Sequence, residues 1–184
     1  MSEKCCNENK HGTVFWLTGV PASGKSTIAD EVQKRLVDLC LPVENLDADE
    51  VRANLSPNLG YTPEARDENT KRLAWMAMML SKYGVNVLVA AVSPLRAYRD
   101  RARSWCPNFV EVHVQAPLEV CQERDPKGLY ARAARGEVND IAGMHMPFED
   151  PESAEVTVDT TAVSVEEAAE AVLAAARQLG YLQA

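Results

Sequence analysis

The chain has 184 residues, of which 46% are hydrophobic and 25% charged, a composition typical of a globular protein that buries its own core. A formal net charge of −8 argues against nucleic acid as the main partner, because phosphate backbones require a basic surface. No apolar stretch approaches the roughly 20 residues of a membrane-spanning helix. Residues 1–10 are polar and lack an apolar signal core. We expect a cytoplasmic protein without a membrane partner, with a flexible tail over residues 1–10 and a single domain over residues 11–184.

The first predicted elements enclose a glycine-rich loop. Residues 14–18 form a short apolar run typical of a buried strand. The loop that follows, GVPASGKST over residues 19–27, fits the phosphate-binding pattern G-x-x-x-x-G-K-[ST]. After the loop, apolar residues at helical spacing predict a helix with an inward face made of Ile28, Ala29, Val32, Leu36 and Leu39. The motif therefore lies between a strand and a helix, which is the context that distinguishes it from a chance glycine-rich turn.

This loop predicts binding of a nucleotide together with Mg²⁺. Gly19 and Gly24 allow a tight turn whose backbone N–H groups point at an anion. The N-terminus of the following helix adds partial positive charge. Lys25 can reach the β- and γ-phosphates, and the Ser26 hydroxyl can ligate Mg²⁺.

Strands and helices alternate along the rest of the chain. Further strands are predicted at residues 42–47, 85–92, 109–114 and 156–159. Helices are predicted within residues 50–55, 63–83, 94–105, 118–124 and 164–180. This order predicts an α/β protein with a three-layer P-loop NTPase fold, in which a mainly parallel central sheet has helices on both faces. The most apolar strand, over residues 85–92, is expected to be the central strand of the sheet.

Two segments late in the chain suit functional loops. Residues 124–137 are dense in charge and glycine, as expected for a lid that closes over a nucleotide and excludes water. Residues 139–153 are expected to form an ordered loop, and loops of that length in compact domains are usually functional.

The five cysteines indicate neither a metal site nor a disulfide framework. Their number is odd, their spacings are scattered and no C-x-x-C pair is present. Cys40 and Cys121 fall on helical patterns and are expected to be small core residues. Cys5 and Cys6 lie in the expected tail.

Polar residues at the ends of predicted strands are candidates for catalysis. In open α/β sheets, ligands bind beyond the carboxyl ends of the strands. Asp47 and Asp49 follow the second predicted strand, and Ser93 follows the third. A carboxylate there could accept a proton from an attacking hydroxyl or hold a metal-bound water. The alternative for the two acids is a turn followed by a helix cap, which competes more strongly for Asp49 than for Asp47.

Basic residues along the chain could neutralise a transferring phosphoryl group, whose equatorial oxygens gather charge. The candidates are Arg52, Arg66, Arg72, Arg96, Arg99, Arg124, Lys127 and Arg132. In a generic protein most of them would be solvated surface residues.

Taken in order, the motifs resemble those of adenylylsulfate kinase. The matching stretches are residues 19–27, 46–52, 59–61, 66–69, 92–94, 124–130 and 143–151. The resemblance extends from about residue 11 to the C-terminus, and the Lys-Gly-Leu-Tyr stretch at residues 127–130 is far more specific than the phosphate loop. Enzymes of this family use ATP to phosphorylate the ribose 3′-OH of adenosine 5′-phosphosulfate (APS), giving 3′-phosphoadenosine 5′-phosphosulfate (PAPS).

The resemblance implies a cytoplasmic, homodimeric, Mg²⁺-dependent transferase of sulfate assimilation, and it assigns roles to individual residues. The expected ATP-binding residues are Gly19, Ala22, Ser23, Gly24, Lys25, Ser26, Thr27, Arg124 and Arg132. The expected substrate-binding residues are Asp49, Arg52, Tyr61, Arg66, Asn69, Ser93, Lys127, Leu129 and Ile141. The expected catalytic residues are Asp47, Lys25 and Ser93, and Ser26 is the expected metal ligand.

Ser93 matches the serine that bacterial family members are described to phosphorylate as an intermediate. Direct in-line transfer requires no covalent intermediate when both substrates are held together. We therefore expect Ser93 to orient the substrate.

Four residues depart from the family pattern near the expected acceptor site. Ala48 and Glu50 stand where the family usually has glycine and asparagine, and Ile141 and His145 stand where it usually has phenylalanine and aspartate. That phenylalanine commonly stacks on the APS adenine, and losing one face of an aromatic sandwich costs about 1–3 kcal/mol. Ile141 can still cover a base by apolar contact.

Two further hypotheses are open, and these departures motivate the first of them. One is a P-loop kinase that phosphorylates a different nucleotide-like molecule or a small alcohol. The other is a nucleotide-binding regulator without catalysis. A regulator would be expected to have lost the acids and the lid cations, whereas Asp47, Asp49, Arg66 and Lys127 are all present.

Overall fold

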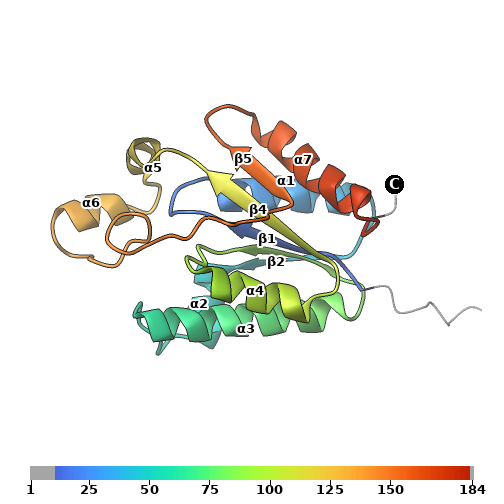
Figure 1. The fold of residues 1–184 in the computed structure, drawn as a ribbon, viewed down its shortest axis with the longest axis horizontal. Helices are drawn as coiled ribbons and strands as arrows, with labels where there is room; N and C mark the ends of the chain where they lie inside the picture. The colour runs from blue at the N-terminus through green and yellow to red at the C-terminus, as the bar shows by residue number, and fades with distance from the viewer. Residues whose placement is uncertain (1–10, 183–184) are drawn as a thin grey trace, which may run out of the picture.

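The computed structural model describes residues 11–182, in which five strands form one parallel sheet (Figure 1). The strand order across the sheet is β2-β3-β1-β4-β5. The strands are β1 (Val14–Thr18), β2 (Val43–Asp47), β3 (Asn86–Ala90), β4 (Phe109–Gln115) and β5 (Val156–Asp159). The predicted tail, with Cys5 and Cys6, lies outside the described residues. None of the helices in the described part combines the length and the apolar composition that a bilayer crossing needs.

Seven helices surround this sheet within residues 11–182. They are α1 (Lys25–Asp38), α2 (Ala48–Leu55), α3 (Pro63–Ser81), α4 (Arg96–Trp105), α5 (Leu118–Arg124), α6 (Leu129–Ala134) and α7 (Val165–Gln178). In Figure 1, α1 and α7 cover one face of the sheet, and α3 and α4 cover the other. The predicted three-layer α/β architecture is therefore confirmed.

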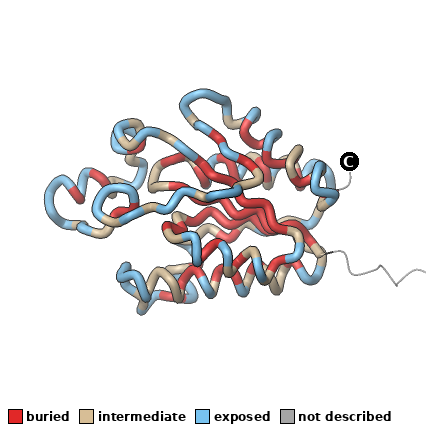
Figure 2. The backbone as a smooth tube through the Cα atoms, in the orientation of Figure 1, coloured by how far each residue is buried: buried red, intermediate tan, exposed pale blue. Residues whose placement is uncertain are grey.

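The central strand is buried on both faces, as its continuous apolar sequence requires. Successive side chains of a strand point to opposite faces. Phe15 and Leu17 pack in the core under α1 and α7, whereas Val14 and Trp16 pack in the core under α3 and α4. Figure 2 shows that the buried residues are concentrated along the strands of the sheet.

Three details of the sequence prediction are wrong. The centre of the sheet is β1, and β3 lies beside it, because two fully buried apolar strands cannot be ranked by composition. Helix α1 ends at Asp38, so Leu39 is 50% exposed instead of facing inward. Cys40 is also exposed and has a φ of 55°, a left-handed conformation that ends the helix. Cys121, by contrast, is fully buried as predicted.

Two helices begin at side-chain caps formed by neighbouring residues. The Thr62 hydroxyl accepts a hydrogen bond from the Ala65 backbone N–H at 3.3 Å, which caps α3 one residue before Pro63. Ser164 and Glu167 form a capping box at the start of α7. These local signals fix where the helices begin and hence which residues face the sheet.

Arg99 is a buried structural residue that the sequence analysis treated as a possible phosphate clamp. Its side chain is 1% exposed, and its Nε donates to Glu111 Oε1 at 2.7 Å. Its two remaining nitrogens donate to the carbonyl oxygens of Ser93 at 2.7 Å and Glu149 at 2.6 Å. Arg99 therefore joins α4, β4, the end of β3 and the loop over residues 139–153.

We expect Arg99→Met to lower the free energy of unfolding by about 3 kcal/mol, because Glu111 and two carbonyl groups would lose a buried charged partner. Urea denaturation followed by circular dichroism measures this change. Arg101→Met is the matched control on the same helix, because its ion pair with Asp67 is partly exposed and worth less than about 1 kcal/mol. Equal losses in the two variants would contradict the assignment.

Candidate active site

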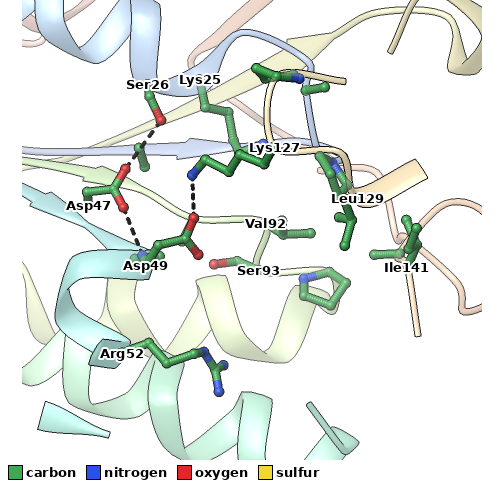
Figure 3. A pocket seen from close by; sticks show the side chains of 18 of the residues that line it. Lys25, Ser26, Asp47, Asp49, Arg52, Val92, Ser93, Lys127, Leu129 and Ile141 are labelled. Atoms are coloured by element: carbon green, nitrogen blue, oxygen red, sulfur yellow. Dashed lines mark hydrogen bonds and ion pairs between the residues drawn. The ribbon is translucent and has the colours of Figure 1, made fainter. Parts of the chain in front are cut away.

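One cavity of about 1440 Å³ opens at the carboxyl ends of β1, β2 and β3, where the sheet edge was expected to bind ligands (Figure 3). Most of the residues predicted for the site line it. They are Ala22, Gly24, Lys25, Ser26, Thr27, Asp47, Asp49, Arg52, Tyr61, Arg66, Asn69, Ser93, Arg124, Lys127, Leu129, Arg132 and Ile141. The predicted residues Gly19 and Ser23 do not line this cavity.

The phosphate loop has the backbone that its glycines predict. Gly24 immediately precedes α1 and has a φ of 105°, which places the helix N-terminus at the cavity. A Cβ atom at Gly19 would lie 2.2 Å from the Val114 carbonyl oxygen, so no larger residue fits there. Ala22 also has a positive φ of 61°, an uncommon conformation for a residue with a side chain. The loop therefore has the inward-turned form that suits anion binding.

Lys25 holds its charge inside this loop. Its Nζ donates to the carbonyl oxygens of Val20 at 2.7 Å and Gly19 at 3.0 Å, and it lies 3.4 Å from the Ser23 hydroxyl. Its relative exposure is 9%, and this burial lowers the pKa of the ammonium group to about 8. A buried ammonium beside a helix N-terminus is well suited to neutralise phosphate oxygens.

Asp47 is both a helix cap and a member of the site. Its Oδ1 accepts hydrogen bonds from the backbone N–H groups of Asp49 at 2.8 Å and Glu50 at 3.3 Å, which caps α2. Its Oδ2 accepts from the Ser26 hydroxyl at 3.4 Å. The sequence pattern favoured the cap interpretation mainly for Asp49. That was wrong, because α2 begins at Ala48, two residues earlier than expected.

Asp49 instead connects α2 to the segment predicted as a lid. Its carboxylate forms an ion pair with Lys127, and Figure 3 shows this pair spanning the cavity. The hydrogen bond that Lys127 donates to the Asp49 carboxylate raises the pKa of Lys127. Both side chains are about two-thirds exposed, at 66% and 64%, so water screens the pair and it can open at little cost.

The segment over residues 124–137 is more ordered than a generic loop. It contains α6, whose first turn is held by Asp125, which accepts from the N–H groups of Tyr130 at 3.1 Å and Ala131 at 2.9 Å. Arg124 donates to the hydroxyl and carbonyl of Thr160 at 2.8 and 3.1 Å. The motion of this segment as a lid stays a prediction.

Arginines, an aromatic ring and an amide form the opposite side of the cavity. The guanidinium carbons of Arg52 and Arg66 lie 4.6 and 5.3 Å from the centre of the Tyr61 ring. Arg66 also donates to the Asp140 carbonyl at 2.6 Å. Asn69 is 4% exposed, and its Oδ1 has no hydrogen-bond partner among residues 11–182. This side therefore offers cations, an aromatic surface and one buried acceptor.

Two departures from the family pattern can now be located. Ile141 borders the cavity but is only 2% exposed, because it packs with Cys121, Tyr130 and Ala133 in a small core beneath the lid segment. Ala48 packs at the edge of the core between β2 and α3. Ile141 thus offers little surface to a base in this conformation.

Thr160 belongs to the site without having been predicted, and three predicted arginines lie outside it. Thr160, directly after β5, lines the cavity, and its hydroxyl donates to the Ser23 carbonyl at 3.0 Å. The rule that ligands bind at strand ends could have found it. Arg72, Arg96 and Arg99 do not line this cavity, because they bind Glu68, Glu152 and Glu111.

The donors near the loop fit Mg²⁺ that arrives with a nucleotide. Mg²⁺ is usually held by one or two protein oxygens together with phosphates and water. The Ser26 hydroxyl and the Asp47 carboxylate provide such oxygens. Within residues 11–182 no three His, Cys, Asp or Glu side chains gather as an all-protein metal site.

The parallel sheet, the phosphate loop and the acidic and cationic groups around one cavity define a P-loop kinase. The family model for adenylylsulphate kinase matches residues 11–159. The adenylyl-sulfate kinase of Synechococcus sp. (strain JA-3-3Ab) is 45% identical over 95% of this chain and 99% of its own length. The probable adenylyl-sulfate kinase of Pyrococcus abyssi is 43% identical over 93% of this chain and 98% of its own.

Solved structures agree with these relatives. The Mycobacterium tuberculosis APS kinase in complex with AMPPNP and APS superposes with a TM-score of 0.87 and 35% identity, over 91% of this chain and 98% of that one. This chain belongs to the adenylylsulfate kinase family.

Proposed function

We propose that this protein transfers the γ-phosphoryl group of ATP to the ribose 3′-OH of APS, giving PAPS and ADP. The observation that carries the proposal is that a phosphate loop and a group of arginines line the same cavity, with Asp47 between them. The family relationship of this chain supports the same reaction, and so does the likeness of its fold to a kinase solved with an ATP analogue and APS.

On the ATP side, the loop backbone, the N-terminus of α1 and Lys25 bind and neutralise the phosphates. Ser26 and Asp47 would hold Mg²⁺, and the ion would supply further neutralisation of the phosphate charge. Arg124 lies beside Thr160 at the mouth of the loop, where it contributes to nucleotide binding. Arg132 acts as a second cation of the lid segment.

On the acceptor side, Arg52 and Arg66 attract the phosphosulfate group of APS. Tyr61 presents an exposed ring to the base and Leu129 adds an apolar contact, whereas Ile141 supports this side of the cavity from the small core beneath α6. The unpartnered Oδ1 of Asn69 accepts a hydrogen bond from a substrate donor, because a buried acceptor without a partner is costly.

Chemistry takes place between the two sides. Asp47 accepts or steers the proton of the attacking hydroxyl through the carboxylate oxygen that faces Ser26. Asp49 and Lys127 close the cavity above it, which positions the acceptor and excludes water. The reaction is an in-line displacement in which positioning and charge neutralisation supply most of the rate.

An assay with purified protein, ATP, MgCl₂ and APS tests the proposal. We expect ADP and a 3′-phosphorylated product to form in equal amounts. Without APS, ADP should form much more slowly. A panel of other nucleotides and small alcohols tests the alternative acceptors. Absence of product with APS, or faster turnover with another acceptor, would refute the substrate assignment, whereas absence of turnover with every acceptor would favour a regulator.

We also propose that the protein is a cytosolic homodimer that acts in sulfate assimilation. The family relationship supports this proposal. Light scattering of the purified chain and fractionation of cells are the measurements that decide these points.

A further inference from the structure

The segment that follows β3 is held by two side chains of the central strand. Trp16 and Thr18 are two residues apart on β1, so both point to the same face of the sheet. The Thr18 hydroxyl donates to the Val92 carbonyl at 2.7 Å, and the Trp16 indole Nε1 donates to the Ser93 hydroxyl oxygen at 3.2 Å. Trp16 is fully buried and stacks on Phe109 with ring centroids 6.1 Å apart.

Ser93 is held in an uncommon conformation. Its φ of +41° is in the left-handed region, which residues with a side chain seldom occupy. Its carbonyl accepts from Arg99 and its hydroxyl oxygen accepts from Trp16, so both the backbone and the side chain are held. Ser93 is 3% exposed and lines the cavity, and Figure 3 shows its side chain pointing into it.

The direction of the hydrogen bond from Trp16 determines what the Ser93 hydroxyl can do. An indole N–H can only donate, so the serine oxygen must accept and must turn its own proton elsewhere. Among residues 11–182 the indole is the only hydrogen-bond partner of this oxygen, which leaves the proton available to a bound molecule. No carboxylate or imidazole in the described part bonds to Ser93, so it lacks the adjacent base that activates a serine nucleophile.

We propose that Trp16 is a positioning residue that presets Ser93 as a hydrogen-bond donor to the acceptor substrate. The proposal rests on the proposed function, because it assumes that the acceptor binds beside Ser93. The indole N–H, buried in the core, thereby controls substrate binding from outside the cavity.

A double-mutant cycle tests this with steady-state kinetics, varying APS and ATP separately. Ser93→Ala is expected to raise KM for APS by about tenfold, the upper range for one neutral hydrogen bond, while KM for ATP changes less than about twofold. Trp16→Phe, which retains an aromatic ring and loses the N–H, is expected to raise KM for APS by about three- to tenfold. In the Ser93→Ala background, Trp16→Phe should add no further change.

Phe109→Leu is the matched control, because it disturbs the packing of the same indole and leaves the N–H in place. It should lower the melting temperature and leave KM for APS unchanged. If Trp16→Phe does not fold, replacing Trp16 with benzothienylalanine, an isostere that lacks the N–H, provides the same comparison.

Three results would overturn the proposal: multiplicative effects of the two substitutions, equal effects on both substrates, or a raised KM for APS in Phe109→Leu. Phosphoserine at position 93, detected by mass spectrometry during turnover, would also overturn it. These failures differ from failure of the proposed function, which would appear as absence of APS turnover in the unmodified protein.

Discussion

Lys25→Ala is expected to lower kcat for APS phosphorylation by about 10²–10³-fold, the cost of removing one preorganised charge from a transferring group. The Lys25 side chain is buried inside the phosphate loop, where its ammonium group contacts the carbonyl oxygens of Gly19 and Val20. Stopped-time assays with saturating ATP and APS measure the loss.

Lys34→Ala is the matched control for this variant. Lys34 lies on the same helix, but its side chain is 69% exposed and only pairs with Glu31. We expect it to retain normal kcat, and circular dichroism should show both variants folded. Near-normal turnover of Lys25→Ala would show that the loop does not act on phosphate as proposed.

The lowered pKa of Lys25 gives the same prediction a pH dependence. Because desolvation lowers this pKa to about 8, the free enzyme loses the ammonium charge as the pH rises above that value. The ratio kcat/KM for ATP should therefore fall above about pH 8, since this ratio reports ionisations of the free enzyme. A profile that stays flat to pH 9.5 would contradict this.

The contribution of Lys25 to folding stability should rise with pH, whereas kcat/KM for ATP should fall. Between about pH 8 and pH 10.5 the unfolded chain holds a proton on Lys25 that the folded, nucleotide-free protein has lost. The contribution of Lys25 to the free energy of unfolding therefore rises with pH across this window. Comparison with Lys25→Ala isolates this contribution from other titrating groups.

Local patterns were sufficient to predict most of the fold and the ATP side of the site. A strand, a glycine-rich loop and a helix are adjacent in sequence, so the geometry around Lys25 and Ser26 follows from nearest neighbours. The caps at Thr62 and Ser164 are likewise set by residues three positions apart.

Pairings between distant residues could not be predicted in this way. Asp49 and Lys127 meet across 78 positions, and Trp16 and Ser93 meet across 77. Arg99 shows why. An arginine can be a surface charge, a phosphate ligand or a buried structural residue. Only the contacts of Arg99 with Glu111 and two carbonyl groups show that it is a buried structural residue. Burial of Ile141 beneath α6 also depends on how the segment folds back.

Asp47→Asn is expected to lower kcat by about 10²-fold or more while leaving the fold almost unchanged. The structure gives the carboxylate two separate tasks, because Oδ1 caps α2 and Oδ2 faces Ser26. Asparagine caps helices as well as aspartate does, so the cap is retained, whereas the negative charge needed to hold Mg²⁺ and to accept a proton is lost.

Asp47→Ala separates the two tasks further. Alanine removes both the charge and the cap, so kcat should fall at least as far as in Asp47→Asn, and the free energy of unfolding should fall by about 1 kcal/mol as well. Asp49→Asn is the control at the same strand end, since it removes a charge that pairs with Lys127 and does not contact Ser26. We expect that variant to raise KM for APS more than it lowers kcat. Near-normal kcat in Asp47→Asn, with the helix cap intact, would mean that this carboxylate serves only the fold.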